Sequence, residues 1–97
     1  MKRALRIYLA WTPEQLTGAF RAADLLLQAG HVPVMQGTSP DWSELDRWRL
    51  EACDCLVRLP GESPKCDCAV DSAKVRGLPV YFSLHDCLNA LPKRVSA

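Results

Sequence analysis

The stretch Arg6-Ile7-Tyr8-Leu9-Ala10-Trp11-Thr12-Pro13-Glu14-Gln15 decides the fold. Its first five residues form a short, mostly apolar and β-prone run, which predicts a strand. The residues that follow predict a helix directly after it, because threonine can cap a helix, proline suits the first helical position and glutamine can complete a capping box. A strand that passes at once into a helix is typical of the βα units that build parallel sheets.

The alternation of strands and helices continues along the chain. Short apolar runs predict further strands at residues 32–36, 55–59 and 79–83. Capping and stop signals predict helices that start at Thr12, Asp41, Ser63 and Leu84 and end near residues 30, 53, 77 and 91. Pro33 has no backbone N–H to donate, so it places the strand at 32–36 on an edge of the sheet.

Apolar residues at helical spacing predict which faces of the first two helices are buried. In the first helix these residues are Leu16, Phe20, Ala23 and Leu27, with Ala19 and Leu26 beside them. In the second helix they are Leu45, Trp48 and Ala52.

Strands that alternate with helices through short loops require right-handed crossovers and a mostly parallel sheet between two helical layers. The sequence therefore predicts a small three-layer α/β sandwich with four or five strands. Residues 1–97 are expected to form one domain, of which 92–97 are a frayed tail.

Composition excludes several classes of function. With 97 residues, 48% of them hydrophobic and 24% charged, the chain is that of a single globular unit. A formal net charge of +1 provides no basic field, so no nucleic acid is expected as a partner. No apolar run is long enough for a signal peptide or a membrane span, so we expect a cytoplasmic protein without a membrane partner, whose five cysteines are thiols.

In a parallel sheet, ligands bind outside the carboxyl ends of the strands. This rule selects residues 11–12, 36–42 and 60–66. In the last segment Gly61 permits close backbone approach, and Ser63 and Pro64 begin a helix whose free N–H groups favour an anion. The alternative is that Ser63 only caps the helix.

Several short motifs, in this order and spacing, suggest a family. They are Ile7-Tyr8-Leu9-Ala10, Ala29-Gly30-His31-Val32, Asp46 seven residues before Cys53-Asp54, Leu59-Pro60-Gly61, Ser63 and Gly77-Leu78-Pro79-Val80. In these motifs the chain resembles the nucleoside 2-deoxyribosyltransferase superfamily, especially its small members. The resemblance implies a flavodoxin-like fold and cleavage of the N-glycosidic bond of deoxynucleosides or deoxynucleotides through a glutamate nucleophile.

The resemblance also implies roles for single residues. Tyr8 and Asp46 occupy positions that the family uses around its pocket, and Ser63 corresponds to a serine that contacts the 5′-phosphate of the substrate. The segment departs from the family pattern in two places, because its glycine is Lys65 and its glutamate is Ala69. A methyl group can neither attack the anomeric carbon nor stabilise its positive charge.

Neighbouring carboxylates are the candidates to replace the missing nucleophile. Asp67 and Asp71 each lie two positions from Ala69, so on a helix their side chains point to a different side from that of Ala69. Glu62 lies in a flexible loop before the helix. Glu62 is the flexible candidate, and Asp67 is kept beside it as the second catalytic candidate of the enzyme alternative. The ligand-binding candidates are Tyr8, Trp11, Thr12, Asp46, Gly61, Ser63, Lys65 and Cys66. Cys66 is also a candidate reactive thiol, because a helix N-terminus and Lys65 both stabilise a thiolate.

No metal and no cofactor are expected. The pairs Cys53-Cys55 and Cys66-Cys68 would lie at opposite ends of the third strand, about 15 Å apart at 3.3 Å per residue, which is too far to share one zinc ion. Cys55 is expected in the core.

Three functions remain open at this point. The first is a nucleoside- or nucleotide-binding protein without the usual nucleophile. The second is an N-glycosidase or deoxyribosyltransferase with a relocated carboxylate. The third is a protein-interaction module that presents Trp42 and Trp48 to another chain. A homo-oligomer is plausible for each, since so short a chain has a modest core.

Overall fold

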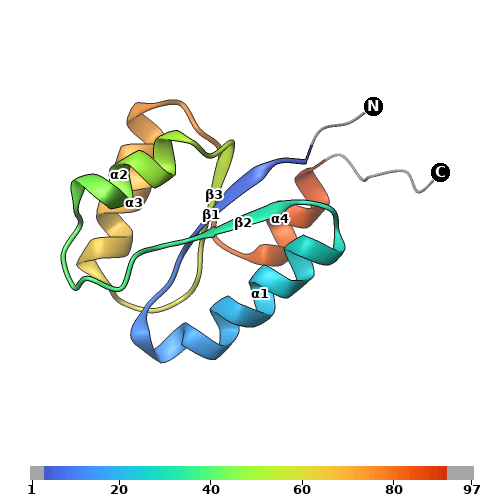
Figure 1. Ribbon diagram of the computed structural model, residues 1–97, viewed down its shortest axis with the longest axis horizontal. Helices are drawn as coiled ribbons and strands as arrows, with labels where there is room; N and C mark the ends of the chain where they lie inside the picture. The colour runs from blue at the N-terminus through green and yellow to red at the C-terminus, as the bar shows by residue number, and fades with distance from the viewer. Residues whose placement is uncertain (1–3, 92–97) are drawn as a thin grey trace.

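The computed structural model describes residues 4–91 and arranges them in three layers (Figure 1). Strands β1 (Arg6–Ala10), β2 (Val32–Met35), β3 (Cys55–Arg58) and β4 (Val80–Tyr81) form one sheet. Their order is β2-β1-β3-β4, and each neighbouring pair is parallel. The predicted α/β sandwich of the flavodoxin-like type is confirmed, with four strands in the described part of the chain. Residues 92–97, expected as a tail, lie outside the described residues.

Helices cover both faces of the sheet. Helices α1 (Leu16–Gln28) and α4 (Leu84–Ala90) lie on one face, and α2 (Glu44–Glu51) and α3 (Pro64–Val75) lie on the other (Figure 1). A single 3-10 turn, Pro13–Gln15, joins β1 to α1. None of the described helices has the length and apolar character needed to cross a bilayer.

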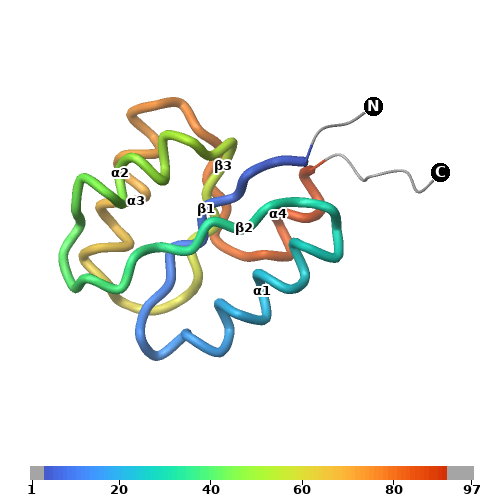
Figure 2. Tube along the Cα trace, viewed as in Figure 1, coloured from blue at the N-terminus to red at the C-terminus, as the bar shows by residue number. Residues whose placement is uncertain are grey.

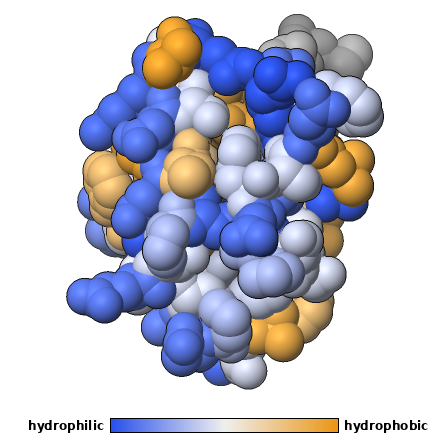
Figure 3. Space-filling model, turned by 90° about the vertical axis from the view of Figure 1, so that its left-hand side faces the viewer, coloured by the Kyte–Doolittle hydropathy of each residue, from blue (hydrophilic) through white to orange (hydrophobic). Residues whose placement is uncertain are grey.

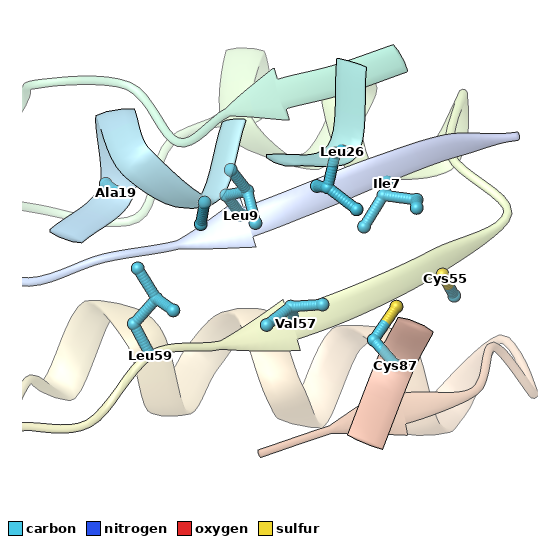
Figure 4. Packing of buried hydrophobic residues seen from close by; sticks show 9 residues of the cluster. Ile7, Leu9, Ala19, Leu26, Cys55, Val57, Leu59 and Cys87 are labelled. Carbon is cyan, nitrogen blue, oxygen red and sulfur yellow. The ribbon is translucent and has the colours of Figure 1, made fainter. Parts of the chain in front are cut away.

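The central strand β1 supplies side chains to two separate cores. Ile7 and Leu9 pack with α1 and α4, and this core is seen in Figure 4, whereas Tyr8 and Ala10 pack with α2 and α3. All four side chains are fully buried. Successive side chains of a strand point to opposite faces, so a strand covered by helices on both sides reads as a continuous apolar run.

Helix α1 buries Ala19 and Leu26 of the predicted apolar face but exposes most of its other members. Ala19, Ala22 and Leu26 are buried, whereas Leu16, Phe20 and Leu27 are 41%, 58% and 57% exposed. Both faces are apolar, so periodicity alone cannot choose between them. The structure uses the face with two alanines, whose small side chains let the helix backbone lie close to the sheet.

The prediction for α2 was wrong for a different reason. Leu45, Trp48 and Ala52 are exposed, and Asp46 and Leu50 are buried instead. A buried aspartate runs against the usual pattern, since charged side chains are rarely buried unless they are paired. The pairing that permits it is a feature of the site described below.

Two helix starts also differ in detail. Ser63 caps α3 as predicted and accepts a hydrogen bond from the Cys66 N–H at 3.2 Å. Helix α2 begins after Ser43, which forms a capping box with Asp46, and not at Asp41. The side chain of Thr12 makes no capping hydrogen bond, so the capping box expected with Gln15 does not form.

Candidate functional site

The loops that follow β1, β2 and β3 gather at one end of the sheet, as expected for parallel strands (Figure 2). We call residues 11–12, 36–42 and 59–63 the first, second and third exit loops. The strand order changes direction between β1 and β3, so the first and third exit loops flank the point where a crevice was predicted.

At that point the two loops pack directly against each other. Gly61 has a φ of +122°, and a Cβ atom there would lie 3.0 Å from Thr12 Oγ1. Thr12 itself is fully buried. The glycine is therefore required by both its backbone angle and this close approach.

Gln36 and Trp11 join the first exit loop to the second through a reciprocal pair of hydrogen bonds. Trp11 Nε1 donates to the Gln36 carbonyl at 3.1 Å, and Gln36 Nε2 donates to the Trp11 carbonyl at 3.0 Å. Cys66 Sγ lies beneath them, 3.4 Å from the same Trp11 carbonyl and 3.7 Å from Gln36 Oε1. Cys66 is fully buried, so the thiol that the sequence suggested as reactive is not exposed to solvent in the folded protein.

A buried ion pair between Asp46 and Lys65 holds the second exit loop against α2 and α3. Lys65 Nζ lies 3.2 Å from Asp46 Oδ2, and the two side chains are only 1% and 5% exposed. The ammonium also donates to the Gly37 carbonyl at 2.8 Å and to the Ser39 carbonyl. All three ammonium protons thus have partners within the protein, which leaves none for a ligand.

The carboxylate oxygens of Asp46 also have all their hydrogen-bond partners within the protein. Its Oδ1 accepts from the Gly37 N–H at 2.9 Å, and its Oδ2 accepts from the Ser43 N–H and hydroxyl at 3.2 and 2.9 Å. Burial alone would raise the pKa of Asp46, but the hydrogen bonds from Gly37, Ser43 and Lys65 outweigh it and hold this pKa below its usual value. Asp46 is therefore ionised at neutral pH, and its hydrogen bonds fix the conformation of the second exit loop.

Tyr8 is a fully buried residue whose hydroxyl has no hydrogen-bond partner. Its ring meets Trp42 edge to face, with 6.3 Å between the centroids. Burial is the main cause that raises the pKa of Tyr8 far above its usual value, and the charge of Asp46 adds to it. Trp42 is therefore part of the core on the α2 and α3 side, while Trp48 remains 56% exposed.

We expect Tyr8→Phe to raise the free energy of unfolding by about 1 kcal/mol, because the substitution removes a buried hydroxyl that gains no hydrogen bond on folding. Urea denaturation measures the change. Tyr81→Phe is the control, since Tyr81 is only half-buried and no gain is expected. A Tyr8→Phe protein that is less stable than wild type would show that the hydroxyl is bonded in solution.

A surface cavity of about 480 Å³ opens beside the buried ion pair. It is lined by residues 34–39 of β2 and the second exit loop, and by Ser43, Leu45, Asp46 and Arg49 of α2 and its cap. Arg49 Nη1 lies 4.0 Å from Asp46 Oδ1, and the arginine side chain is 39% exposed. Since Lys65 already balances Asp46, the three charged groups together carry one positive charge beside this cavity.

Sequence reasoning missed Leu45 and Arg49 as lining residues, whereas Thr38 and Ser39 lie within the selected segment 36–42. Arg49 was detectable in principle, because it lies one helical turn from Leu45 and from Asp46. To find Arg49 from the sequence, one would have had to place the N-cap of α2 at Ser43, because the start of the helix sets the direction of each side chain.

The carboxylates predicted to act in catalysis lie apart from this cavity. Glu62 is exposed in the third exit loop. Asp67 is exposed on α3 and pairs with Arg58, whose Nη2 lies 3.1 Å from Asp67 Oδ1. Ala69, which the resemblance of the sequence motifs aligns with a catalytic glutamate, is fully buried in the core between α3 and the sheet.

The cysteines do not form a metal centre in the part of the chain that the structure describes. Cys53 and Cys55 lie on opposite faces of the sheet, and all five thiols are free. His31 is buried near the start of β1, where its Nδ1 accepts from the Leu5 N–H at 3.2 Å. It is therefore at the end of the sheet opposite the exit loops.

No protein-family model, curated protein or solved structure matches this chain. The fold and the site define a class, namely a small parallel α/β domain with a polar cavity at the carboxyl end of an edge strand. Within that class, the likeness to nucleoside 2-deoxyribosyltransferases stays a prediction carried by the sequence motifs.

Proposed function

We propose that this protein binds a nucleoside or nucleoside 5′-monophosphate in the cavity between β2 and α2, and that it does not cleave the glycosidic bond. The observation that carries the proposal is a 480 Å³ cavity bordered by a cation. Small-molecule sites commonly occupy about 300–1,000 Å³, with apolar walls and a few polar groups. Val34 and Leu45 supply apolar wall here, and Arg49 with Ser39 supplies polar groups.

The charge distribution favours an anionic ligand. Arg49 presents guanidinium N–H groups at the cavity. The carboxylate of Asp46 is already paired with Lys65 and accepts hydrogen bonds from backbone N–H groups. A guanidinium can hold a phosphate through two parallel hydrogen bonds. The base and sugar would then lie along Val34 and Leu45.

The absence of turnover in this proposal follows from the placement of the carboxylates. Glycosidic cleavage needs a carboxylate on the reacting face of the sugar. Asp67 is engaged with Arg58 on the outside of α3, and Ala69 offers no functional group. Glu62 stands on the third exit loop, which is not part of the cavity lining. The alternative of a relocated carboxylate predicts release of free base.

Calorimetric titration with nucleosides and nucleoside 5′-monophosphates tests the proposal, with chromatography of the same mixtures for free base. We expect the monophosphate to bind more tightly than its nucleoside, and Arg49→Gln to weaken monophosphate binding by about tenfold or more, since a hydrogen bond to a charged group contributes about 1.5–3 kcal/mol. No free base should appear.

Arg47→Gln is the matched control, because Arg47 is also on α2 but pairs with Glu44 and Glu51 away from the cavity. An equal loss of monophosphate affinity in both variants would mean that only the net charge of the protein matters, and it would contradict a binding site at Arg49. Release of base would instead support the enzyme, with Glu62→Ala and Asp67→Ala identifying the carboxylate. Monophosphate binding that is unchanged in Arg49→Gln would place the ligand elsewhere.

A further inference from the structure

Two cysteine side chains from different layers meet in the core on the α1 and α4 side of the sheet. Cys55 is the first residue of β3, and Cys87 lies in the middle of α4. Their sulfur atoms face each other across the space between strand and helix (Figure 4). The two thiols are close enough that each perturbs the pKa of the other. Both residues belong to the same buried apolar cluster.

We propose that Cys55 and Cys87 form a reversible disulfide with each other when the protein meets a small-molecule disulfide such as oxidised glutathione, and that this bond ties α4 to β3. An S–S bond is about 2.05 Å long, so the two sulfur atoms must approach each other further before they can bond. Pairs whose Cβ vectors diverge cannot close in this way, whereas these two side chains point toward each other.

Formation of the disulfide takes two thiol–disulfide exchange steps. Either cysteine can be the first nucleophile. When Cys87 acts first, its thiolate attacks one sulfur of oxidised glutathione and expels a glutathione thiolate, which leaves a mixed disulfide on Cys87.

The second step closes the protein disulfide. Cys55 loses its proton and attacks Cys87 Sγ, which expels the second glutathione thiolate. Two electrons pass from the protein to the oxidant, and the two protons lost by the cysteines are taken up by the two glutathione molecules released. Excess reduced glutathione reverses both steps.

The other three cysteines lack such a partner thiol. Cys53 lies on the opposite face of the sheet, where its Sγ donates to the Arg49 carbonyl at 3.2 Å. Cys66 Sγ lies beside the Trp11 carbonyl. Cys68 is exposed on α3. Cys55 and Cys87 are thus the pair that the fold brings together.

Oxidation requires α4 to move away from the sheet, because Cys55 and Cys87 are 2% and 0% exposed. Helix α4 has only seven residues, and its flanking apolar side chains Leu84 and Leu88 are only half-buried. Local opening of such a short element costs less than global unfolding. Low concentrations of urea should therefore accelerate formation of the disulfide.

Incubation of the wild-type protein in a glutathione redox buffer, followed by alkylation of free thiols and peptide mapping by mass spectrometry, tests the proposal. We expect a product that has lost two hydrogen atoms, with Cys55 and Cys87 linked and three thiols alkylated. The link closes a loop of about 30 residues, so the melting temperature should rise on the order of 10 °C and fall back on reduction.

Cys87→Ala should abolish this product, and Cys68→Ser is the matched control that should leave it intact. Three outcomes would overturn the proposal. They are glutathione attached to Cys68 alone, a disulfide between any other two cysteines, and a protein that stays fully reduced in oxidising buffer. The wild-type peptide map decides the question even where an alanine variant fails to fold.

Discussion

The variant Ala69→Glu is expected to lose about 4 kcal/mol or more of its free energy of unfolding and to release no base from deoxynucleosides. Ala69 is fully buried in the core between α3 and the sheet. A glutamate there would add volume to a packed core and place a carboxyl group where it has no partner, and each effect is destabilising. Urea denaturation and chromatography of the nucleoside mixtures measure the two outcomes.

Cys68→Glu is the matched control for this variant. It adds the same side chain one position earlier on α3, at an exposed site, so we expect a change within about 0.5 kcal/mol. If Ala69→Glu were as stable as Cys68→Glu and cleaved deoxynucleosides, α3 would have to expose residue 69 to a substrate. The proposal of binding without turnover would then apply only to the natural sequence.

The second large effect is expected for Lys65→Met, which should cost about 3–5 kcal/mol because it leaves the Asp46 carboxylate buried without its counter-ion. The same substitution removes the donor of the Gly37 and Ser39 carbonyls. Lys74→Met is the control, since Lys74 is exposed near the end of the same helix. Urea denaturation at neutral pH compares the variants.

A double-mutant cycle separates the ion pair from the rest of the effect. Asp46→Asn keeps an acceptor for the Gly37 N–H but removes the charge, so the double variant should be less destabilised than the sum of the single variants by about 1–3 kcal/mol. Strict additivity would contradict an energetic coupling between Asp46 and Lys65.

The pH dependence of stability gives a second measure of the same pair. The pKa of Asp46 is lowered in the folded protein, so its contribution is complete above the unfolded pKa of about 3.9 and is lost as the pH falls through the folded pKa. In Asp46→Asn this part of the acid destabilisation should be absent. An unchanged acid profile would show that Asp46 is not held ionised by its neighbours.

The order of the strands and helices along the chain was predictable because local signals govern it, although β4 is shorter than the predicted strand at 79–83 and α2 begins later than Asp41. Residues 6–10 form β1 as predicted, Ser63 caps α3, and Pro33 lies on an edge strand. Each of these features depends on a few neighbouring residues and on backbone chemistry that tertiary contacts did not override.

The buried helix faces and the lining of the candidate site were less predictable. On α2 the exposed side chains are the apolar ones, and the buried Asp46 depends on Lys65, which lies 19 positions away in sequence and on another helix. No local pattern on α2 indicates that a lysine of α3 will be there. Arg49 was missed for the same reason, because its place at the cavity follows from the face that Asp46 turns inward.

The sequence by itself determined the alternation of strands and helices, the parallel sheet and the presence of an alanine at position 69. Only the tertiary structure decided that Lys65 is an internal partner of Asp46, that Gly61 packs on Thr12, and that an open cavity lies beside β2. The physical reason is the separation along the sequence of the residues that interact. Helix caps and strand runs depend on neighbouring residues, whereas a buried charge, a close backbone contact and a cavity depend on residues that meet only after the chain has folded.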